Sequence, residues 1–142
     1  MNLILKIKKL DPDAIIPQYA HTDDAGMDFY AIETIALKPG ERIGVSTGLA
    51  IEIPEGYVGL VWDKSGISIN DGIKTLGGVI DAGYRGEIKI GIINLSSTDY
   101  VLKKGHKIAQ ILIQKVEQPD IIEVRELSDS ERGKNGFGST GK

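Results

Sequence analysis

Apolar residues recur at every second position in five stretches of this chain. A strand turns successive side chains to opposite faces, so a period of two is typical of strands with one face in the core. An amphipathic helix would need apolar residues three or four positions apart. We therefore expect strands whose core-facing residues are Leu3, Leu5 and Ile7; Ile43, Val45 and Thr47; Leu49, Ile51 and Ile53; Val58, Leu60 and Trp62; and Ile88, Ile90 and Ile92.

Turn-forming residues separate these stretches. Glycine makes up 18 of the 142 residues, well above the usual level of about 7%, which agrees with many tight turns. One short helix is expected around residues 65–70, with Ser65 as a candidate N-cap. The length and the spacing together predict one all-β domain, a sandwich or a barrel. The turns are Lys38-Pro39-Gly40, Pro54-Glu55-Gly56, Asp71-Gly72, Asp81-Ala82-Gly83 and Lys104-Gly105.

Charge and composition exclude several classes of protein. A formal net charge of −3 does not attract nucleic acid or an anionic membrane. No stretch without charge is longer than that of residues 90–98, which is about half of the ~18 residues that a membrane span needs. The chain has no cysteine, so disulfides, thiolate nucleophiles and cysteine-bound metals are excluded, and its two histidines, His21 and His106, lie far apart. We expect a cytoplasmic protein without a nucleic-acid or membrane partner.

The amino-acid composition of the chain changes after Leu127. The segment 128–142 is rich in glycine and has one large apolar residue, Phe137. It could be a disordered terminus, or a flap that closes on a flat anionic ligand, because no acidic residue follows Arg132. The sequence GFGSTG matches the pattern G-x-G-x-x-G, but only Lys142 follows it, so no dinucleotide-binding helix can form there.

Two interior stretches carry polar groups where apolar ones are expected. Asp28 interrupts the apolar run in 24–31, either as an exposed edge residue or as a functional carboxylate. In 63–67, Lys64 and Ser65 stand where a strand gives way to a helical turn. That turn could bind phosphate, or it could be a capped turn with a solvated lysine.

A third stretch, residues 77–87, is the most specific. Asp81 follows the apolar end of a strand, and Tyr84 comes after a tight turn. This order suits a carboxylate held above a pocket with an aromatic floor. A type I turn that begins with Asp has the same spacing, so both interpretations remain open at this point.

Taken in order, five motifs resemble those of the homotrimeric dUTP pyrophosphatases, and the likeness covers nearly the whole chain. The resemblance implies a jelly-roll-like β-barrel over residues 1–127, a flexible flap over 128–142 and a homotrimer with active sites between subunits. It also implies Mg²⁺-dependent hydrolysis of dUTP to dUMP and pyrophosphate, which removes dUTP from the nucleotide pool and supplies dUMP for dTMP synthesis. The motifs are AGMDFYA, WDKSGI, GGVIDAGYRGEI, GHKIAQIL and RGKNGFGSTG.

The same resemblance implies a role for each matching residue. Asp81 resembles the base that deprotonates the attacking water, Tyr84 the ring that excludes a 2′-hydroxyl, and Asp28 the carboxylate that holds metal-bound water. Lys64 departs from the family's usual arginine, and a lysine lacks the bidentate fork. The remaining positions are Gly78, Val79 and Ile80, with Thr75 and Lys89, for uracil; Lys64, Ser65, Gly66 and Gln110 for phosphates; and Phe137 for stacking on uracil, with Arg132, Ser139 and Thr140 on phosphates.

Two other functions are alternatives to dUTP hydrolysis. A dCTP deaminase, or a bifunctional deaminase and pyrophosphatase, shares the resemblance but carries a glutamate ten residues beyond the motif aspartate. That position is Gly91 here, which removes the proton shuttle that deamination needs. A non-catalytic β-barrel that only binds a nucleotide or a protein is the other alternative, and turnover separates all three.

Overall fold

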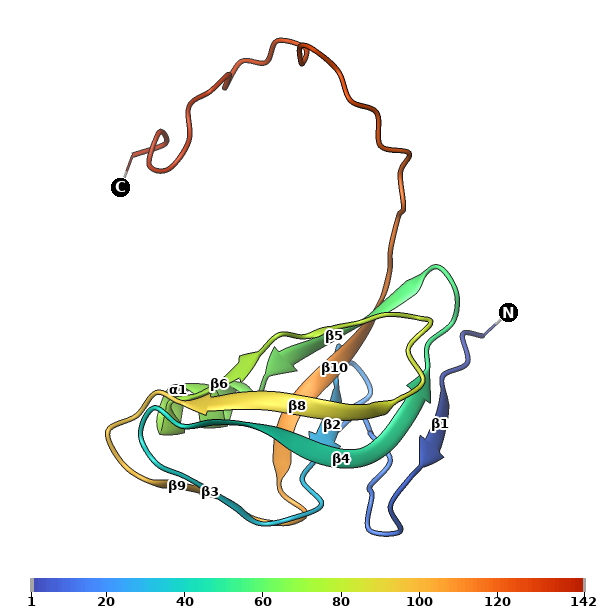
Figure 1. Cartoon of the computed structure of the whole chain (residues 1–142), viewed down its shortest axis with the longest axis vertical. Coiled ribbons are helices and arrows are strands. Elements are labelled where there is room, and N and C mark those ends of the chain that lie inside the picture. The colour runs from blue at the N-terminus through green and yellow to red at the C-terminus, as the bar shows by residue number, and fades with distance from the viewer. Residues whose placement is uncertain (1, 142) are drawn as a thin grey trace.

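The computed structural model describes residues 2–141, and strands make up most of its regular structure (Figure 1). Ten strands and one helix follow one another along these residues. They are β1 (Lys6–Lys9), β2 (Met27–Tyr30), β3 (Ile35–Leu37), β4 (Arg42–Glu52), β5 (Tyr57–Asp63), α1 (Ser65–Asp71), β6 (Ile73–Leu76), β7 (Val79–Ile80), β8 (Glu87–Asn94), β9 (Tyr100–Leu102) and β10 (Lys107–Lys115).

Two four-stranded antiparallel sheets carry the fold. The first has the strand order β1-β4-β8-β6, and the second has the order β2-β10-β5-β7. A third sheet consists of β3 and β9 only. The segment from β6 to β7, which we call the hairpin after its sharp turn at Gly77 and Gly78, therefore starts in one large sheet and ends in the other, and its two strands do not pair with each other.

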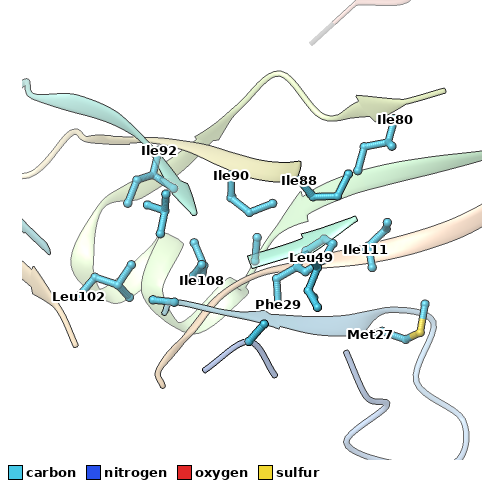
Figure 2. Close-up of a cluster of buried hydrophobic side chains, with 14 of the residues drawn as sticks. Met27, Phe29, Leu49, Ile80, Ile88, Ile90, Ile92, Leu102, Ile108 and Ile111 are labelled. Atoms are coloured by element: carbon cyan, nitrogen blue, oxygen red, sulfur yellow. The ribbon is translucent and has the colours of Figure 1, made fainter. Parts of the chain in front are cut away.

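The core lies between the two large sheets (Figure 2). Ile88, Ile90 and Ile92 of β8 face inward toward Phe29 of β2 and Ile111 of β10, and all five are buried. Burying a side chain of this size contributes about 1.5–3 kcal/mol. The period-two expectation for this strand is confirmed, and its apolar face holds the sheets together.

Four of the residues expected to face the core do not face it. In β5, Trp62 is exposed and Leu60 faces away from the core, whereas Tyr57 and Val61 pack against it. Both faces of this strand are apolar, so alternation alone could not decide which face turns inward. Leu3 and Ile43, both at or before the beginning of a strand, are also exposed.

The two stretches expected at residues 43–47 and 49–53 form a single strand, β4. Its pairing with β8 shifts between Ser46 and Ala50, and Gly48 has a φ of +68°. Between these pairs β4 advances four residues while β8 advances two, so β4 carries two extra residues in a bulge that bends the strand locally. The bulge lets one long strand continue where the sequence suggests two.

The helix expected at residues 65–70 is confirmed as α1, but Ser65 is not its N-cap. Lys64 occupies that position, and no side chain caps the helix. Gly72 closes the helix in a left-handed conformation, with a φ of +69°. None of the helices in residues 2–141 is long and apolar enough to cross a membrane.

The segment after β10 leaves the two sheets and arches away from them (Figure 1). The last strand ends at Lys115, so the sheets stop before the predicted boundary at residue 127. That boundary remains a prediction. In the single chain the apolar residues between these points are exposed, namely Ile121, Ile122, Val124 and Leu127.

Candidate active site

A pocket of about 520 Å³ opens between the hairpin that contains β7 and the start of β8. Asp81, the first residue after β7, is exposed at this pocket. The structure thus brings five of the predicted site residues to one pocket, namely Val79, Ile80, Asp81, Tyr84 and Lys89. The lining residues are Val79, Ile80, Asp81, Tyr84, Glu87, Ile88 and Lys89.

The turn after Asp81 fixes the ring of Tyr84. The main-chain N–H of Tyr84 donates to the carbonyl oxygen of Asp81 at 3.1 Å, and its hydroxyl donates to the carbonyl oxygen of Glu87 at 3.0 Å. A Cβ at Gly86 would lie 2.5 Å from the Tyr84 hydroxyl oxygen, so only glycine leaves room for the ring there. The ring of Tyr84 therefore forms a fixed wall of the pocket, and 47% of the surface of this residue is exposed.

The strand β7 offers a main chain that no neighbouring strand covers on one side. It is the last strand of its sheet and pairs only with β5, through Gly59 opposite Ile80 and Leu60 opposite Val79. An edge strand presents N–H and C=O groups that lack partners. These groups can form hydrogen bonds with the edge of a flat polar ligand such as a nucleobase.

A buried carboxylate holds the lysine that precedes the helix. Asp28 on β2 is 2% exposed, and its Oδ1 lies 2.6 Å from Nζ of Lys64. Its Oδ2 lies 2.8 Å from Nζ of Lys107 on β10. Burial alone would raise the pKa of Asp28, but the two ammonium groups outweigh burial and hold that pKa below its ordinary value.

Magnesium has no complete set of side-chain ligands in residues 2–141, because no group of three His, Asp or Glu residues gathers there. Asp28 fits a looser role. No aligned hydrogen-bond donor satisfies its Oδ1, and Lys64 contacts that atom as a charge. A water molecule on a bound metal ion could donate to this oxygen, so the role predicted for Asp28 stays a prediction that its chemistry permits.

The other candidate phosphate-binding residues gather at α1. Ser65 and Gln110 line a second pocket of about 420 Å³, and a Cβ at Gly66 would meet open space. The side-chain amide of Gln110 donates to the carbonyl oxygen of Asp63 at 2.9 Å. A Cβ at Gly26 would overlap Oε1 of Gln110, so the glycine of the first motif makes space for a residue of the fourth.

Thr75 is buried, and it contacts Asp63 at the end of β5. Oδ1 of Asp63 accepts the main-chain N–H of Thr75 at 2.7 Å and its hydroxyl at 3.0 Å. Lys74 places its Nζ 2.7 Å from Oδ2. Partial burial would raise the pKa of Asp63, yet Lys74 and Thr75 outweigh it and hold the pKa low.

The candidate residues of the tail stay apart from both pockets. Phe137 is fully exposed and has a φ of +32°, and Nε of Arg132 donates to the carbonyl oxygen of Asn135 at 2.7 Å. Ser139 and Thr140 are exposed in the same segment. A single chain therefore presents the predicted site in three separate parts: the Asp81 pocket, the residues around α1, and the tail.

Comparison with known proteins shows to which family this chain belongs. The family model described as dUTPase matches residues 12–141 of this chain. The chain belongs to the dUTPase family. The resemblance that the five motifs predicted is thereby confirmed, and so is the jelly-roll-like β fold with one short helix.

Known dUTPases match over nearly the full length. The deoxyuridine 5′-triphosphate nucleotidohydrolase of Nautilia profundicola is 51% identical over 97% of this chain and 99% of its own length. The dUTPase of Staphylococcus bacteriophage 80alpha with dUPNHPP has a TM-score of 0.93 at 35% identity, covering 98% of this chain and 99% of that one. A mutant dUTPase from phage phi11 of S. aureus, described with a structural Mg(II) ion, has a TM-score of 0.84 at 30% identity and covers 89% and 99%.

The sequence did not point to three residues that the dUTPase fold brings into the site. Lys107 pairs with Asp28, Asp63 binds Thr75, and Glu87 lines the pocket. The register of β2 on β10, which sets Asp28 opposite Gln110, brings Lys107 near the carboxylate. That pairing joins the first motif to the fourth, so alternation within one strand carried no signal of it.

Proposed function

We propose that this chain hydrolyses dUTP to dUMP and pyrophosphate, with Asp81 as the general base. The observation that carries the proposal is the position of Asp81, which follows the free edge of β7 and shares a pocket with the fixed ring of Tyr84. The Asp81 carboxylate takes a proton from water, and the water oxygen forms a bond to the α-phosphorus. The bond from that phosphorus to the bridging oxygen breaks, and pyrophosphate leaves with the electron pair.

The uracil ring is read by the main chain of Gly78, Val79 and Ile80. The free N–H and C=O groups of β7 can pair with the carbonyl oxygens and the N3–H of uracil, a pattern that cytosine does not share. Lys89 lines the same pocket from β8, and Thr75 stands at the base of the hairpin. Phe137 stacks on the other face of the base once the tail closes, which contributes about 1–3 kcal/mol.

The sugar is selected by Tyr84. A main-chain hydrogen bond fixes the turn that carries Tyr84, and the ring hydroxyl donates to the carbonyl oxygen of Glu87, so the ring cannot retreat from a larger ligand. A 2′-hydroxyl on the ribose would collide with this wall, whereas a deoxyribose packs against it. Selection by a fixed ring is steric, and it therefore depends on the ring rather than on its hydroxyl.

The phosphates are bound by Lys64, Ser65, Gly66 and Gln110, and by Arg132, Ser139 and Thr140 of the tail. A nucleoside triphosphate carries about four negative charges, so a carboxylate base can approach it only if cations screen the repulsion. Mg²⁺ carried on the phosphates supplies part of that charge when bound. Asp28 holds Lys64 close to the helix start, and its carboxylate would accept a hydrogen bond from water on the metal.

We infer a homotrimer whose sites are shared between subunits. The three parts of the site are separate in one chain, and the tail carries exposed Ile121 and Leu127 away from the sheets. The outer face of β5 and β7 also exposes Trp62 and Val79. A cluster of exposed apolar side chains often marks a surface that a partner covers, and sedimentation analysis should give three times the chain mass of 15.4 kDa.

Deamination of dCTP is disfavoured by the space around Gly91. A Cβ at this position would lie 3.0 Å from the carbonyl oxygen of Leu76 and 3.2 Å from its Cβ. A glutamate, the proton shuttle that a deaminase needs, does not fit there without moving β6. A protein that binds without turnover is the remaining alternative, and the exposed Asp81 beside a nucleotide-sized pocket argues against it.

The deciding experiment measures pyrophosphate release with Mg²⁺ from dUTP, dCTP, dTTP and UTP. We expect release from dUTP alone at an appreciable rate, with dUMP as the nucleotide product. Release of ammonia or of a uracil nucleotide from dCTP would favour the deaminase. The absence of any turnover, despite binding of a non-hydrolysable dUTP analogue, would favour a binding protein.

A further inference from the structure

Asp63 links the two large sheets at the end of β5. It ends β5 in the second sheet, and its carboxylate accepts two hydrogen bonds from Thr75 on β6 in the first sheet, at 2.7 and 3.0 Å. Thr75 is buried, so these bonds are partly shielded from water and stronger than exposed ones would be. The carboxylate therefore fixes where the β6 to β7 hairpin begins relative to β5.

The same residue contacts the phosphate side through its main chain. The carbonyl oxygen of Asp63 accepts the side-chain amide of Gln110 at 2.9 Å. The next residue, Lys64, is the N-cap position of α1 and is held by Asp28. Asp63 is therefore the point where the base-reading hairpin and the phosphate-binding residues meet within one chain.

Beyond Thr75 the segment is tied to β5 by main-chain bonds only, the first from the N–H of Val61 to the carbonyl oxygen of Gly78 at 2.7 Å. After Thr75 the chain passes through Gly77 and Gly78, which both have positive φ, and reaches the two-residue strand β7. Glycines of this kind leave the main chain free to change direction. Without the carboxylate of Asp63, β6 would lose its direct side-chain link to β5.

We propose that Asp63 is a positioning residue that couples base binding at β7 to phosphate binding at Lys64 and Gln110. The proposal rests on the proposed function of these two regions. When a ligand orders one region, the free-energy cost of ordering the other region falls, because both regions are anchored to the carboxylate and the main chain of Asp63. The coupling holds whether the two regions serve one site or neighbouring sites of an oligomer.

The coupling can be measured with two fragments of the substrate. Deoxyuridine probes the hairpin, and inorganic tripolyphosphate with Mg²⁺ probes the phosphate side. In the wild type, saturating deoxyuridine should raise the affinity for tripolyphosphate about fivefold or more, with the reciprocal effect of the same size. In Asp63→Ala each fragment should still bind alone, but the coupling factor should fall to about one.

Two matched variants separate positioning from general stability. Asp63→Asn keeps an Oδ1 that accepts both bonds from Thr75. Lys74→Met removes the ion pair at Oδ2 and the ammonium's contacts with the carbonyl and hydroxyl oxygens of Thr75, at 3.2 and 3.5 Å, but it leaves both bonds from Thr75 to Oδ1 in place. Both should keep the wild-type coupling factor. Loss of coupling in Lys74→Met would overturn the proposal, because the ion pair and not the Thr75 bonds would then carry the effect.

A wild-type coupling factor in Asp63→Ala would also overturn it. If Asp63→Ala does not fold, Thr75→Val removes one of the two bonds and should lower the factor, and an unchanged factor there overturns the proposal. Normal dUTP hydrolysis without coupling in the wild type would refute the role of Asp63 and leave the proposed function standing. Absence of dUTP hydrolysis would refute the proposed function itself.

Discussion

The main-chain N–H of Val61 donates a hydrogen bond to the carbonyl oxygen of Gly78 at 2.7 Å. This bond holds the turn that precedes β7 directly against β5. Gly78 has a φ of +137°, and a Cβ there would lie 2.7 Å from the carbonyl oxygen of Val61. Glycine is therefore required at this position for two reasons: the positive φ, and the close approach to the carbonyl oxygen of Val61.

Gly78→Ala should cost about 1–3 kcal/mol of folding stability through backbone strain. It should also displace β7 and lower dUTP turnover strongly. Urea unfolding and pyrophosphate release measure the two effects. The control is Gly83→Ala in the following turn, where a Cβ would have open space, and equal losses in both variants would contradict this account of Gly78.

Asp81→Asn should abolish hydrolysis and leave binding of dUPNHPP unchanged. The amide has nearly the same shape as the carboxylate, but it cannot accept the proton of the attacking water. A general base typically contributes 10²–10⁴-fold to the rate. Single-turnover rates measure the loss, and a variant that keeps more than half the wild-type rate would show that another group is the base.

Tyr84→Ala should narrow the discrimination between dUTP and UTP, because the wall against the 2′-hydroxyl disappears. Tyr84→Phe is the matched control, since it keeps the ring and loses only the hydrogen bond to Glu87. The ratio of kcat/KM for the two nucleotides measures selection. An unchanged ratio in Tyr84→Ala, with dUTP turnover intact, would mean that the sugar is read elsewhere.

Asp28→Asn should lower folding stability at neutral pH by about 1–3 kcal/mol, less than a fully buried pair would lose because both lysines reach solvent. The folded-state pKa of Asp28 lies below its ordinary value of 3.8. The stabilisation is therefore complete above about pH 4 and is lost as the pH falls through the folded-state pKa.

The free energy of unfolding of the two proteins should consequently converge at low pH. Urea unfolding between pH 7 and pH 2.5 measures this convergence. Asp23→Asn, at an exposed position in the same segment, is the control and should leave stability nearly unchanged at every pH. A constant gap between wild type and Asp28→Asn down to the lowest pH would contradict the ion-pair account.

Removal of residues 128–142 should leave thermal stability and oligomeric state nearly unchanged, because no core residue is lost. Turnover should fall strongly, since Phe137 and Arg132 can no longer close over the nucleotide. Wild-type turnover by the truncated chain would mean that the tail is a terminus without function.

A tryptophan at position 137 reports closure directly. Trp62 is the one natural tryptophan and is exposed beside the candidate phosphate-binding residues, so it must first be replaced in Trp62→Phe. Phe137→Trp in that background should change its emission with dUPNHPP and Mg²⁺, and hardly at all with pyrophosphate. An equal response to pyrophosphate would contradict stacking on the base.

The fold class and the helix could be predicted because they depend on local patterns. Alternation in β8 and the residues around Ser65 each specify one element. The inward face of β5 could not be predicted, since Trp62 and Val61 are both apolar and the pairing with β10 decides between them. The order of the motifs indicated the candidate site, but its contacts lie between distant segments.

Asp28 illustrates this limit. Its sequence context fits an exposed edge residue as well as a functional one, and only the register of β2 on β10 brings Lys107 to it. Asp63 directly precedes Lys64 in the second motif, but its local sequence does not indicate a role, because its partner Thr75 belongs to the other sheet. Long-range pairing of this kind leaves no periodic signal in the sequence.

The place of β10 in its sheet bears on how the chain folds. Within residues 2–141 it is the last strand along the chain, yet it lies between β2 and β5 and pairs with both. Until it emerges during synthesis, β2 and β5 have open edges that can pair with other chains. The second sheet therefore closes late, and slow synthesis or truncation before Lys115 should leave nascent chains prone to aggregation.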